Sequence, residues 1–263
     1  MNDDADRTAA ALARLYDLDL LDDPGDVDLY LALAARAGGP ILELGAGTGR
    51  IAIPLAQAGY DVTAVDNDAA MLARARAAAE GAGLEMTARL TLVRRDIAGL
   101  RLDEAGSYRL AFIGLNSLFL LDGRAAQAEA VATIAAHLAP GGLAAVDAWL
   151  PDAEDLGRCD GRLVLEWVRR DPETAFLVTK TGSALHDAAT STVHLTSIFE
   201  EGAPGRPPAR WVREDRLRLT SADELRAFAE AAGLEVETIA GGYDLQPLAP
   251  GSERAILVAR KPD

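Results

Sequence analysis

Several residue types are scarce in this chain, and each scarcity excludes a class of protein. Cys159 is the one cysteine among 263 residues, so the chain can form neither an internal disulfide nor a cysteine-based metal cluster, and we expect no metal. Basic residues are also few, since 26 Lys and Arg stand against 41 Asp and Glu, for a net charge of −15. Such an acidic chain lacks the basic face that attracts nucleic acid or an anionic membrane, and we expect neither partner.

Long apolar runs and export signals are missing as well. No uninterrupted apolar stretch approaches the length of a membrane span. Residues 1–4 contain neither the basic nor the apolar region of an export signal, from which we expect a cytoplasmic protein. Acidic residues crowd residues 3–28 instead, and we interpret this segment as solvated and helix-capping.

The apolar fraction of 49% is ample for a core, and its distribution predicts the class of fold. From residue 40 onward, short apolar strand-like runs alternate with segments of helical periodicity. This alternation predicts an α/β protein with a mostly parallel sheet covered on both faces. The predicted strands are 41–44, 60–65, 90–93, 110–114 and 143–147, and the predicted helices include 69–81 and 124–138.

The rhythm changes after the fifth predicted strand. Four strand-like runs follow without helices between them, and consecutive strands with short turns predict an antiparallel meander. A helix that starts in capping-box spacing, Ser221 with Glu224, then returns the chain to the α/β pattern. We expect four parts: an N-terminal helical cap at 1–39, a ligand-binding core at 40–150, the meander at 151–220, and completion of the core sheet at 221–263.

A glycine-rich turn follows the first predicted strand. Gly45, Gly47 and Gly49 occupy alternate positions directly before a helical pattern. Strand, glycine turn and helix in this order are the start of a nucleotide-binding βαβ unit. The glycines let the backbone approach a ligand closely, and the helix start offers free N–H groups to a polar or anionic group.

Further candidates come from the ends of the later strands, where an open parallel sheet binds its ligand. Asp66 ends the second strand, and its carboxylate can accept hydrogen bonds from ribose hydroxyls. Asp96 and Ile97 follow the third strand, and a carboxylate beside an apolar side chain suits the amine and ring of adenine. Leu115 and Asn116 follow the fourth strand. These positions predict an adenosine-containing ligand.

Glu43, the glycine turn and the strand-end acids together resemble the class I S-adenosylmethionine-dependent methyltransferases over nearly the whole chain. Residues 43–49 look like their motif I, and residues 138–142 look like the turn before their fifth strand. The resemblance implies a doubly wound, Rossmann-like sheet of seven strands with the last one antiparallel. It also implies S-adenosylmethionine as the cofactor and S-adenosylhomocysteine as the product.

The same resemblance implies which residues hold the cofactor. Met71 would flank the adenine, and Tyr16 of the N-terminal helices would help cover the cofactor. The full set of expected cofactor-binding residues is Tyr16, Glu43, Gly45, Ala46, Gly47, Thr48, Gly49, Arg50, Asp66, Asn67, Met71, Asp96, Ile97, Leu115 and Asn116.

The meander resembles the lid of small-molecule methyltransferases that act on glycine or on the amines of nucleotide sugars. Residues 114–117 depart from the Asn/Asp-Pro-Pro-Tyr pattern of enzymes that methylate nucleic acids or glutamine amides. We therefore expect a small-molecule acceptor, with N-methylation favoured slightly over O-methylation. The enzyme is expected to be a monomer or a homodimer.

Catalytic candidates are few because an amine acceptor needs no strong base, whereas a hydroxyl acceptor does. His194 on a meander strand is the best candidate base, with Tyr16 as a further catalytic candidate. His137 is interpreted as a structural cation at the end of a helix. Trp149 at the end of the fifth strand and His194 are the candidate substrate-binding residues.

Other functions stay open at this point. A nicotinamide-dependent oxidoreductase fits less well, because Arg50 occupies the place of the third glycine in the dinucleotide fingerprint. A non-catalytic S-adenosylmethionine-binding module would bind the cofactor without forming the product. Aminopropyl transfer from the decarboxylated cofactor would require an acidic polyamine pocket.

Overall fold

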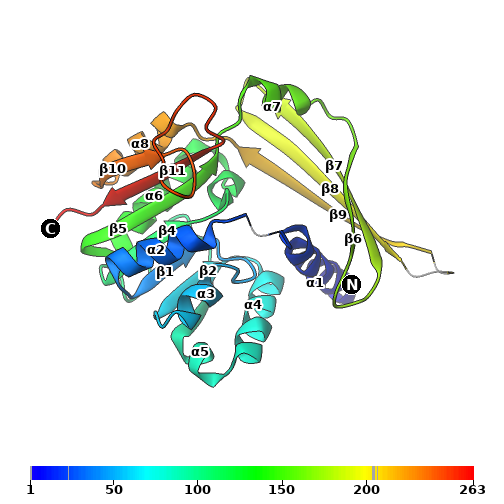
Figure 1. Ribbon diagram of the computed structural model, residues 1–263, viewed down its shortest axis with the longest axis horizontal. Helices are drawn as coiled ribbons and strands as arrows, with labels where there is room; N and C mark the ends of the chain where they lie inside the picture. The colour runs from blue at the N-terminus through cyan, green and yellow to red at the C-terminus, as the bar shows by residue number, and fades with distance from the viewer. Residues whose placement is uncertain (1, 23, 203–204, 206) are drawn as a thin grey trace. The chain divides into compact units, whose positions relative to one another are not determined.

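The structure is a computed structural model that describes residues 2–22, 24–202, 205 and 207–263 (Figure 1). The chain folds as two compact units. The lid unit comprises Met1–Asp23 and Pro151–Leu219, and the core unit comprises Pro24–Leu150 and Thr220–Asp263. Among the described residues, no helix combines the length and the apolar character that crossing a membrane requires.

The core unit is built on a seven-stranded sheet in the order β10-β11-β5-β4-β1-β2-β3. Only β11 runs antiparallel to its neighbours, which confirms the predicted doubly wound architecture. All four residues of β1 are buried, because a central parallel strand has helices against both of its faces. The strands are β1 (Ile41–Leu44), β2 (Val62–Asp66), β3 (Leu90–Arg94), β4 (Tyr108–Ile113), β5 (Leu138–Trp149), β10 (Glu235–Ala240) and β11 (Arg254–Arg260).

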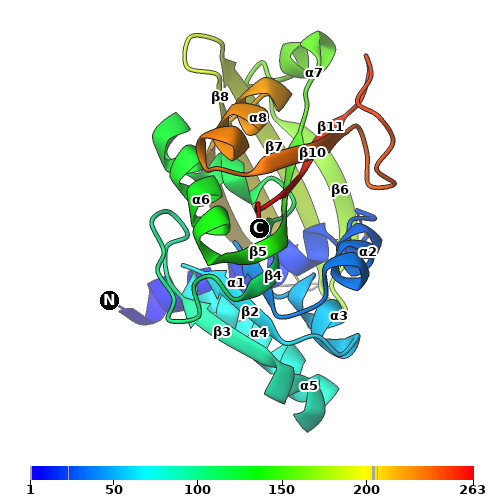
Figure 2. The same ribbon diagram turned by 90° about the vertical axis from the view of Figure 1, so that its left-hand side faces the viewer.

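Helices cover both faces of this sheet. Helices α2 and α3 pack on one face, with α4 beside α3, while α6 and α8 pack on the other (Figure 2). Ser221 caps α8 and Glu224 completes the predicted capping box. The helices of the core unit are α2 (Val27–Ala37), α3 (Ala52–Gln57), α4 (Ala69–Ala82), α5 (Leu84–Arg89), the 3₁₀ helix η1 (Ser117–Leu120), α6 (Gly123–His137) and α8 (Ala222–Ala231).

Some predicted element boundaries are wrong. Strand β5 begins at Leu138, before the Pro140–Gly142 turn at which the helix was expected to end and after which the strand was expected to start. The short helices α5, η1 and α7 (Ala153–Arg158) were not predicted at all. None of them exceeds six residues, so each completes too few turns to show a helical period in the sequence.

The lid unit contains the predicted antiparallel meander. Its four strands are hydrogen-bonded in chain order, and each neighbouring pair is antiparallel. They are β6 (Val164–Arg170), β7 (Leu177–Asp187), β8 (Thr192–Gly202) and β9 (Ala209–Arg218).

Helix α1 (Asn2–Asp19) packs against one face of this meander, so it belongs to the lid unit, whereas α2 belongs to the core unit. Leu15 and Leu18 are buried together with Val178 of β7 and Phe199 of β8. Trp167 of β6 packs against the same cluster. Burial of these apolar side chains is the main force that docks α1 on the sheet.

Polar contacts fix the C-terminal end of α1 on the same face. Asp19 accepts hydrogen bonds from Trp167 Nε1 at 2.8 Å and from Lys180 Nζ at 2.6 Å. Arg169 Nη1 donates to the carbonyl oxygen of Leu18 at 2.7 Å, where the helix leaves its last carbonyls unpaired. Asp19 is half-buried in this contact, so the interpretation of residues 3–28 as solvated is wrong for Asp19, whereas Asp22 is exposed while it pairs with Arg169.

Replacing Lys180 should test this docking. Its ammonium group is largely buried between Asp19 and Glu166, at 2.6 and 2.8 Å. Lys180→Ala leaves the two carboxylates facing each other and should lower the free energy of unfolding of the lid unit by about 1–3 kcal/mol. Hydrogen exchange of the α1 amides should rise with it. Arg210→Ala, which removes an exposed ion pair with Glu200 on the same sheet, serves as the control and should cost less than about 1 kcal/mol.

Candidate active site

The site begins where the strand order of the core sheet reverses. β1 and β4 are neighbours, and the chain continues from β1 toward β2 on one side and from β4 toward β5 on the other. The turns that follow β1 and β4 therefore diverge and leave a crevice at the carboxyl edge of the sheet. Gly45 lies at this point with φ +78°, and a Cβ placed on it would lie 2.8 Å from the Cβ of Ser117. Both the backbone conformation and the space require glycine here.

The glycine turn is tied to the end of β2. The N–H groups of Gly45 and Ala46 both donate to the carbonyl oxygen of Val65, at 2.8 and 3.0 Å. Gly47 N donates to Asp66 Oδ2 at 2.8 Å, and the other carboxylate oxygen accepts from Asp68 N at 2.8 Å. Burial raises the pKa of Asp66, and these N–H donors offset part of that shift. Each oxygen keeps a further lone pair for a ligand hydroxyl.

Glu43 lies in β1, directly before the turn, and is 3% exposed. Burial raises its pKa to about 8, even though nearby Arg50 and a hydrogen bond from the backbone of Ala52 both favour the ionised form. Its Oε2 atom has no hydrogen-bond partner among the described residues. A buried carboxylate oxygen of this kind is available to a ligand donor.

Arg50 ends the glycine-rich segment and forms an ion pair that the sequence does not reveal. Its Nη1 and Nη2 atoms donate to the two carboxylate oxygens of Asp26 at 2.6 and 2.7 Å. Asp26 is fully buried, so the expectation of a solvated acidic segment is wrong for this residue too. A two-point guanidinium–carboxylate pair is rigid, and it fixes the start of α2 against the glycine turn. Because aspartates crowd this segment, the sequence does not distinguish Asp26 as a buried residue.

The turn after β4 is held by side chains from β5 and β11. Leu115 and Asn116 have φ values of +40° and +64°, which are uncommon for residues other than glycine. Asn116 Oδ1 accepts hydrogen bonds from Trp149 N at 2.6 Å and from Arg254 Nη2 at 3.0 Å. The side-chain oxygen of Asn116 therefore braces the turn, which explains how the unusual backbone is maintained.

Asp147 is the centre of this bracing. It is fully buried, accepts from Leu115 N at 3.1 Å and from Tyr243 Oη at 3.2 Å, and pairs with Arg254 Nε at 2.6 Å. Burial raises its pKa, and Arg254 opposes the shift. Burial and Asp147 together raise the pKa of Tyr243, which therefore stays protonated and donates. Tyr243 and Arg254 were not predicted, because Tyr243 lies within the loop between β10 and β11 and Arg254 begins β11 rather than ending a strand.

The remaining predicted core residues lie at the ends of β2 and β3. Met71 in the first turn of α4 is buried, and Ile97 is buried beyond β3. Asn67 and Asp96 are exposed, and Asp96 Oδ1 accepts from Ala98 N at 2.9 Å. The structure thus brings an apolar pair and two polar groups to the same edge of the sheet as the glycine turn.

His137 and His194 lie in different environments. His137 is fully buried, with Nδ1 2.7 Å from the carbonyl oxygen of Thr133 and Nε2 accepting from Leu102 N at 3.1 Å. A ring nitrogen that accepts an N–H carries no proton, so His137 is neutral and the expected helix-end cation is wrong. His194 is exposed and, by the alternation along β8, lies on the face of the meander opposite to Phe199 and helix α1.

Tyr16 and His194 are both in the lid unit, whereas Trp149 and the glycine turn are in the core unit. The roles proposed for Tyr16, His194 and Trp149 stay predictions. Trp149 is half-buried, and its backbone N–H is used by Asn116.

Comparisons with known proteins agree with this fold. Residues 41–142 match the protein family described as a methyltransferase domain. The chain is 29% identical over 230 residues to the cypemycin N-terminal methyltransferase of a Streptomyces species, covering 85% of this chain and 84% of that protein. The CcbJ methyltransferase from Streptomyces caelestis superposes with a TM-score of 0.76 at 25% identity, over 92% of this chain and 97% of that one.

A further solved structure is that of CalS10 from Micromonospora echinaspora, an amino pentose methyltransferase with S-adenosylmethionine bound. It superposes with a TM-score of 0.71 at 20% identity, over 94% of this chain and 96% of that one. The fold, the methyltransferase domain and these likenesses define the protein as an enzyme of the class I methyltransferase fold. It is an S-adenosylmethionine-dependent methyltransferase. The protein is therefore neither the nicotinamide-dependent oxidoreductase, nor the non-catalytic binding module, nor the aminopropyl transferase considered above.

Stability should report the protonation of Glu43. Because its pKa in the folded protein, about 8, lies above the ordinary value of 4.5, the native state binds a proton that the unfolded state releases between these pH values. The free energy of unfolding should therefore fall by up to about 1.4 kcal/mol per pH unit over this range. Glu43→Gln should remove this loss, so the free energy of unfolding of the variant should rise relative to that of the wild type from pH 5 to pH 8. The assignment is contradicted if the difference in free energy of unfolding between the two proteins stays constant from pH 5 to pH 8.

Asp66 should be needed for cofactor binding. Asp66→Ala removes the acceptor of Gly47 N and the acceptor predicted for ribose hydroxyls, and should weaken S-adenosylmethionine binding by about 1.5–3 kcal/mol in calorimetry. Asp66→Asn, which keeps one oxygen acceptor, should fall between this variant and the wild type. Asp61→Ala at the opposite end of β2 is the matched control and should bind normally. An unchanged affinity for Asp66→Ala refutes the assignment.

Proposed function

We propose that the protein transfers the methyl group of S-adenosylmethionine to a nitrogen atom of a small-molecule acceptor. The observation that carries this proposal is the likeness to the cypemycin N-terminal methyltransferase, because it extends over most of both chains, lid unit included. The name of CalS10, an amino pentose methyltransferase, supports the same class of acceptor atom. The net charge of −15 supports a small acceptor rather than nucleic acid.

The residues at the carboxyl edge fit the proposed cofactor. Two buried polar atoms, Glu43 Oε2 and Tyr30 Oη, lack hydrogen-bond partners among the described residues. Tyr30 lies against the turn after β4, since a Cβ placed on Gly114 would lie 3.4 Å from its hydroxyl. Buried atoms of this kind call for a ligand or an ordered water. The methionyl group provides an ammonium and a carboxylate, which suit the unpaired carboxyl oxygen of Glu43 and the hydroxyl of Tyr30.

We assign the parts of the cofactor accordingly. Residues 43–50 would lie under the methionyl group, and Asp66 with Asn67 would bind the ribose. Met71, Asp96 and Ile97 would enclose the adenine, while Leu115 and Asn116 would line the far wall. Tyr16 of the lid unit would complete the cover. Asp26 acts through Arg50 and Asp147 acts through the 115–116 turn, so both are positioning residues.

The bound sulfonium would supply an activated methyl group, so the chain has little bond-breaking chemistry of its own to perform. Its tasks are to align the acceptor nitrogen with the methyl group and to exclude water. A neutral amine attacks without prior deprotonation, so no general base is needed. This agrees with Asp147, whose carboxylate accepts from three donors and is therefore not free to act as a base. For a hydroxyl acceptor, His194 or Tyr16 would be needed as a base, worth about 10²–10⁴-fold in rate. Trp149 and His194 would contact the acceptor.

Acceptor pairs that differ only in one atom test the proposal. The enzyme is incubated with S-adenosylmethionine and a panel of amino sugars, each matched with the sugar bearing a hydroxyl in place of the amine. S-adenosylhomocysteine and a singly methylated product should form with amines only, and the rate should rise with pH up to the pKa of the acceptor amine. Asp66→Ala is the control for cofactor-dependent turnover. Methylation of the hydroxyl members would overturn the preference for nitrogen.

A further inference from the structure

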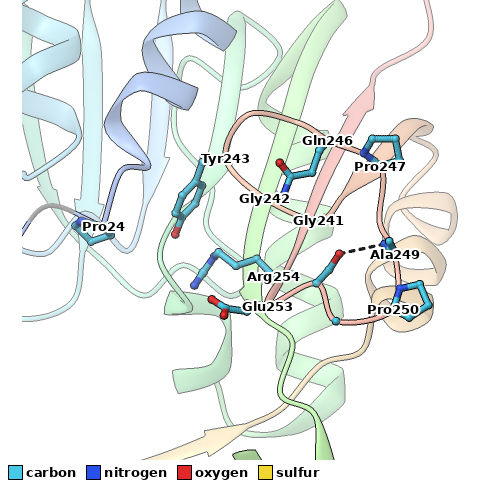
Figure 3. A pocket seen from close by; sticks show the side chains of 12 residues that line it. Pro24, Gly241, Gly242, Tyr243, Gln246, Pro247, Ala249, Pro250, Glu253 and Arg254 are labelled. Atoms are coloured by element: carbon cyan, nitrogen blue, oxygen red, sulfur yellow. Dashed lines mark hydrogen bonds between the residues drawn. The ribbon is translucent and has the colours of Figure 1, made fainter.

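A pocket of about 510 Å³ lies beside the braced turn, in the loop between β10 and β11 (Figure 3). Its volume is within the range of small-molecule sites. Proline side chains give it a rigid apolar wall, and Tyr243, Gln246, Ser252, Glu253 and Arg254 supply its polar groups. Ala249 and the prolines Pro24, Pro247 and Pro250 also line it.

The loop that forms the pocket is held in shape by its own contacts. Gly241 N donates to the carbonyl oxygen of Gln246 at 2.8 Å, and Ala249 N donates to Ser252 Oγ at 3.0 Å. A Cβ placed on Gly241 would lie 2.3 Å from Ser252 Oγ and 3.0 Å from its Cβ, so the two ends of the loop pack closely here. The pocket is therefore a formed feature of the core unit.

Arg254 connects this pocket to the active site. Its guanidinium lies 5.1 Å from the centre of the Tyr243 ring and bonds to both Asp147 and Asn116. One side chain thus lines the pocket and braces the turn after β4.

The charges of the pocket select its ligand. The positive charge of Arg254 is balanced by Asp147, whereas the exposed carboxylate of Glu253 has no ion pair or hydrogen bond within the part of the chain that the structure describes. Glu253 is therefore the uncompensated charge of the lining, in a protein whose net charge is already −15. A cationic ligand group is attracted here, and a phosphate is repelled.

We propose that this pocket is an acceptor subsite that takes an amine-bearing, cationic part of the acceptor against Glu253. The inference rests on the proposed function and deepens it. A nitrogen that attacks the methyl group needs a free lone pair, so the protonated amine in the pocket is a second one. The acceptor class is then a molecule with two amines, and a nucleotide diphosphate sugar is disfavoured.

Direct binding to the full chain tests this inference without turnover. The probes are trans-1,4-diaminocyclohexane, trans-4-aminocyclohexanol, which replaces one amine by a hydroxyl, and uridine 5′-diphosphate, each titrated in the presence of S-adenosylhomocysteine. The diamine should bind about threefold to tenfold more tightly than the amino alcohol, as expected for one partly exposed charge contact. Glu253→Gln should abolish this difference, and Glu235→Gln at the opposite end of the same strand pair should preserve it. Ala249→Trp, which fills the pocket, should remove the binding of both cyclohexanes.

Four outcomes overturn the proposal: tighter binding of the diphosphate than of the diamine, an undiminished preference in Glu253→Gln, unchanged binding in Ala249→Trp, or no binding of either cyclohexane at millimolar concentration. Each variant must retain its affinity for S-adenosylhomocysteine, which shows that it is folded. Because no methyl transfer is measured, failure of the proposed function leaves the binding result intact. Conversely, the subsite proposal alone fails if the wild-type enzyme methylates amines while Glu253→Gln and Ala249→Trp bind the cyclohexane probes as the wild type does.

Discussion

The hydrogen bond between Gly47 N and the Asp66 carboxylate is the contact on which the carboxyl edge of the core sheet depends. It joins the turn after β1 to the end of β2, and two further N–H groups of the turn bind the Val65 carbonyl oxygen beside it. The Asp26–Arg50 pair clamps the far end of the same turn. With both ends fixed, the glycines expose backbone to a ligand without a loss of rigidity, which is what preorganised binding requires.

A second constraint is electrostatic. Three buried carboxylates (Asp26, Glu43 and Asp147) share the core with two guanidinium groups, those of Arg50 and Arg254. Two of the carboxylates are paired, and the third relieves the imbalance through its raised pKa. The two pairs have the same architectural purpose, because each connects a turn at the switch point to a distant part of the chain. The turns at the switch point are thus held by two ion pairs, Asp26–Arg50 and Asp147–Arg254.

The features that the sequence predicts well are those with local signatures. The alternating apolar runs predict the seven-stranded sheet and the meander, and the Ser221–Glu224 spacing predicts the start of α8. Residues joined only by the fold escape such analysis: Asp26 lies far along the chain from Arg50, and Tyr243 and Arg254 lie far from Asp147 and Asn116. His137 shows the same limit, because its neutral state depends on the N–H of Leu102, which no helical pattern reveals.

The direction of β11 has a consequence for how such an enzyme can diversify. In a parallel strand, only the residues at the end reach the ligand edge, and the sheet register fixes them. β11 runs the opposite way, so its first residue reaches that edge. The loop before β11 lies at the same edge, and its length is not fixed by the sheet register. Residues 244–253 can therefore lengthen, shorten or change composition while Tyr243 still reaches Asp147 and Arg254 stays paired opposite Trp149. Under the assignment proposed above, acceptor preference can therefore change in this hairpin while residues 43–50, assigned to the cofactor, stay constant.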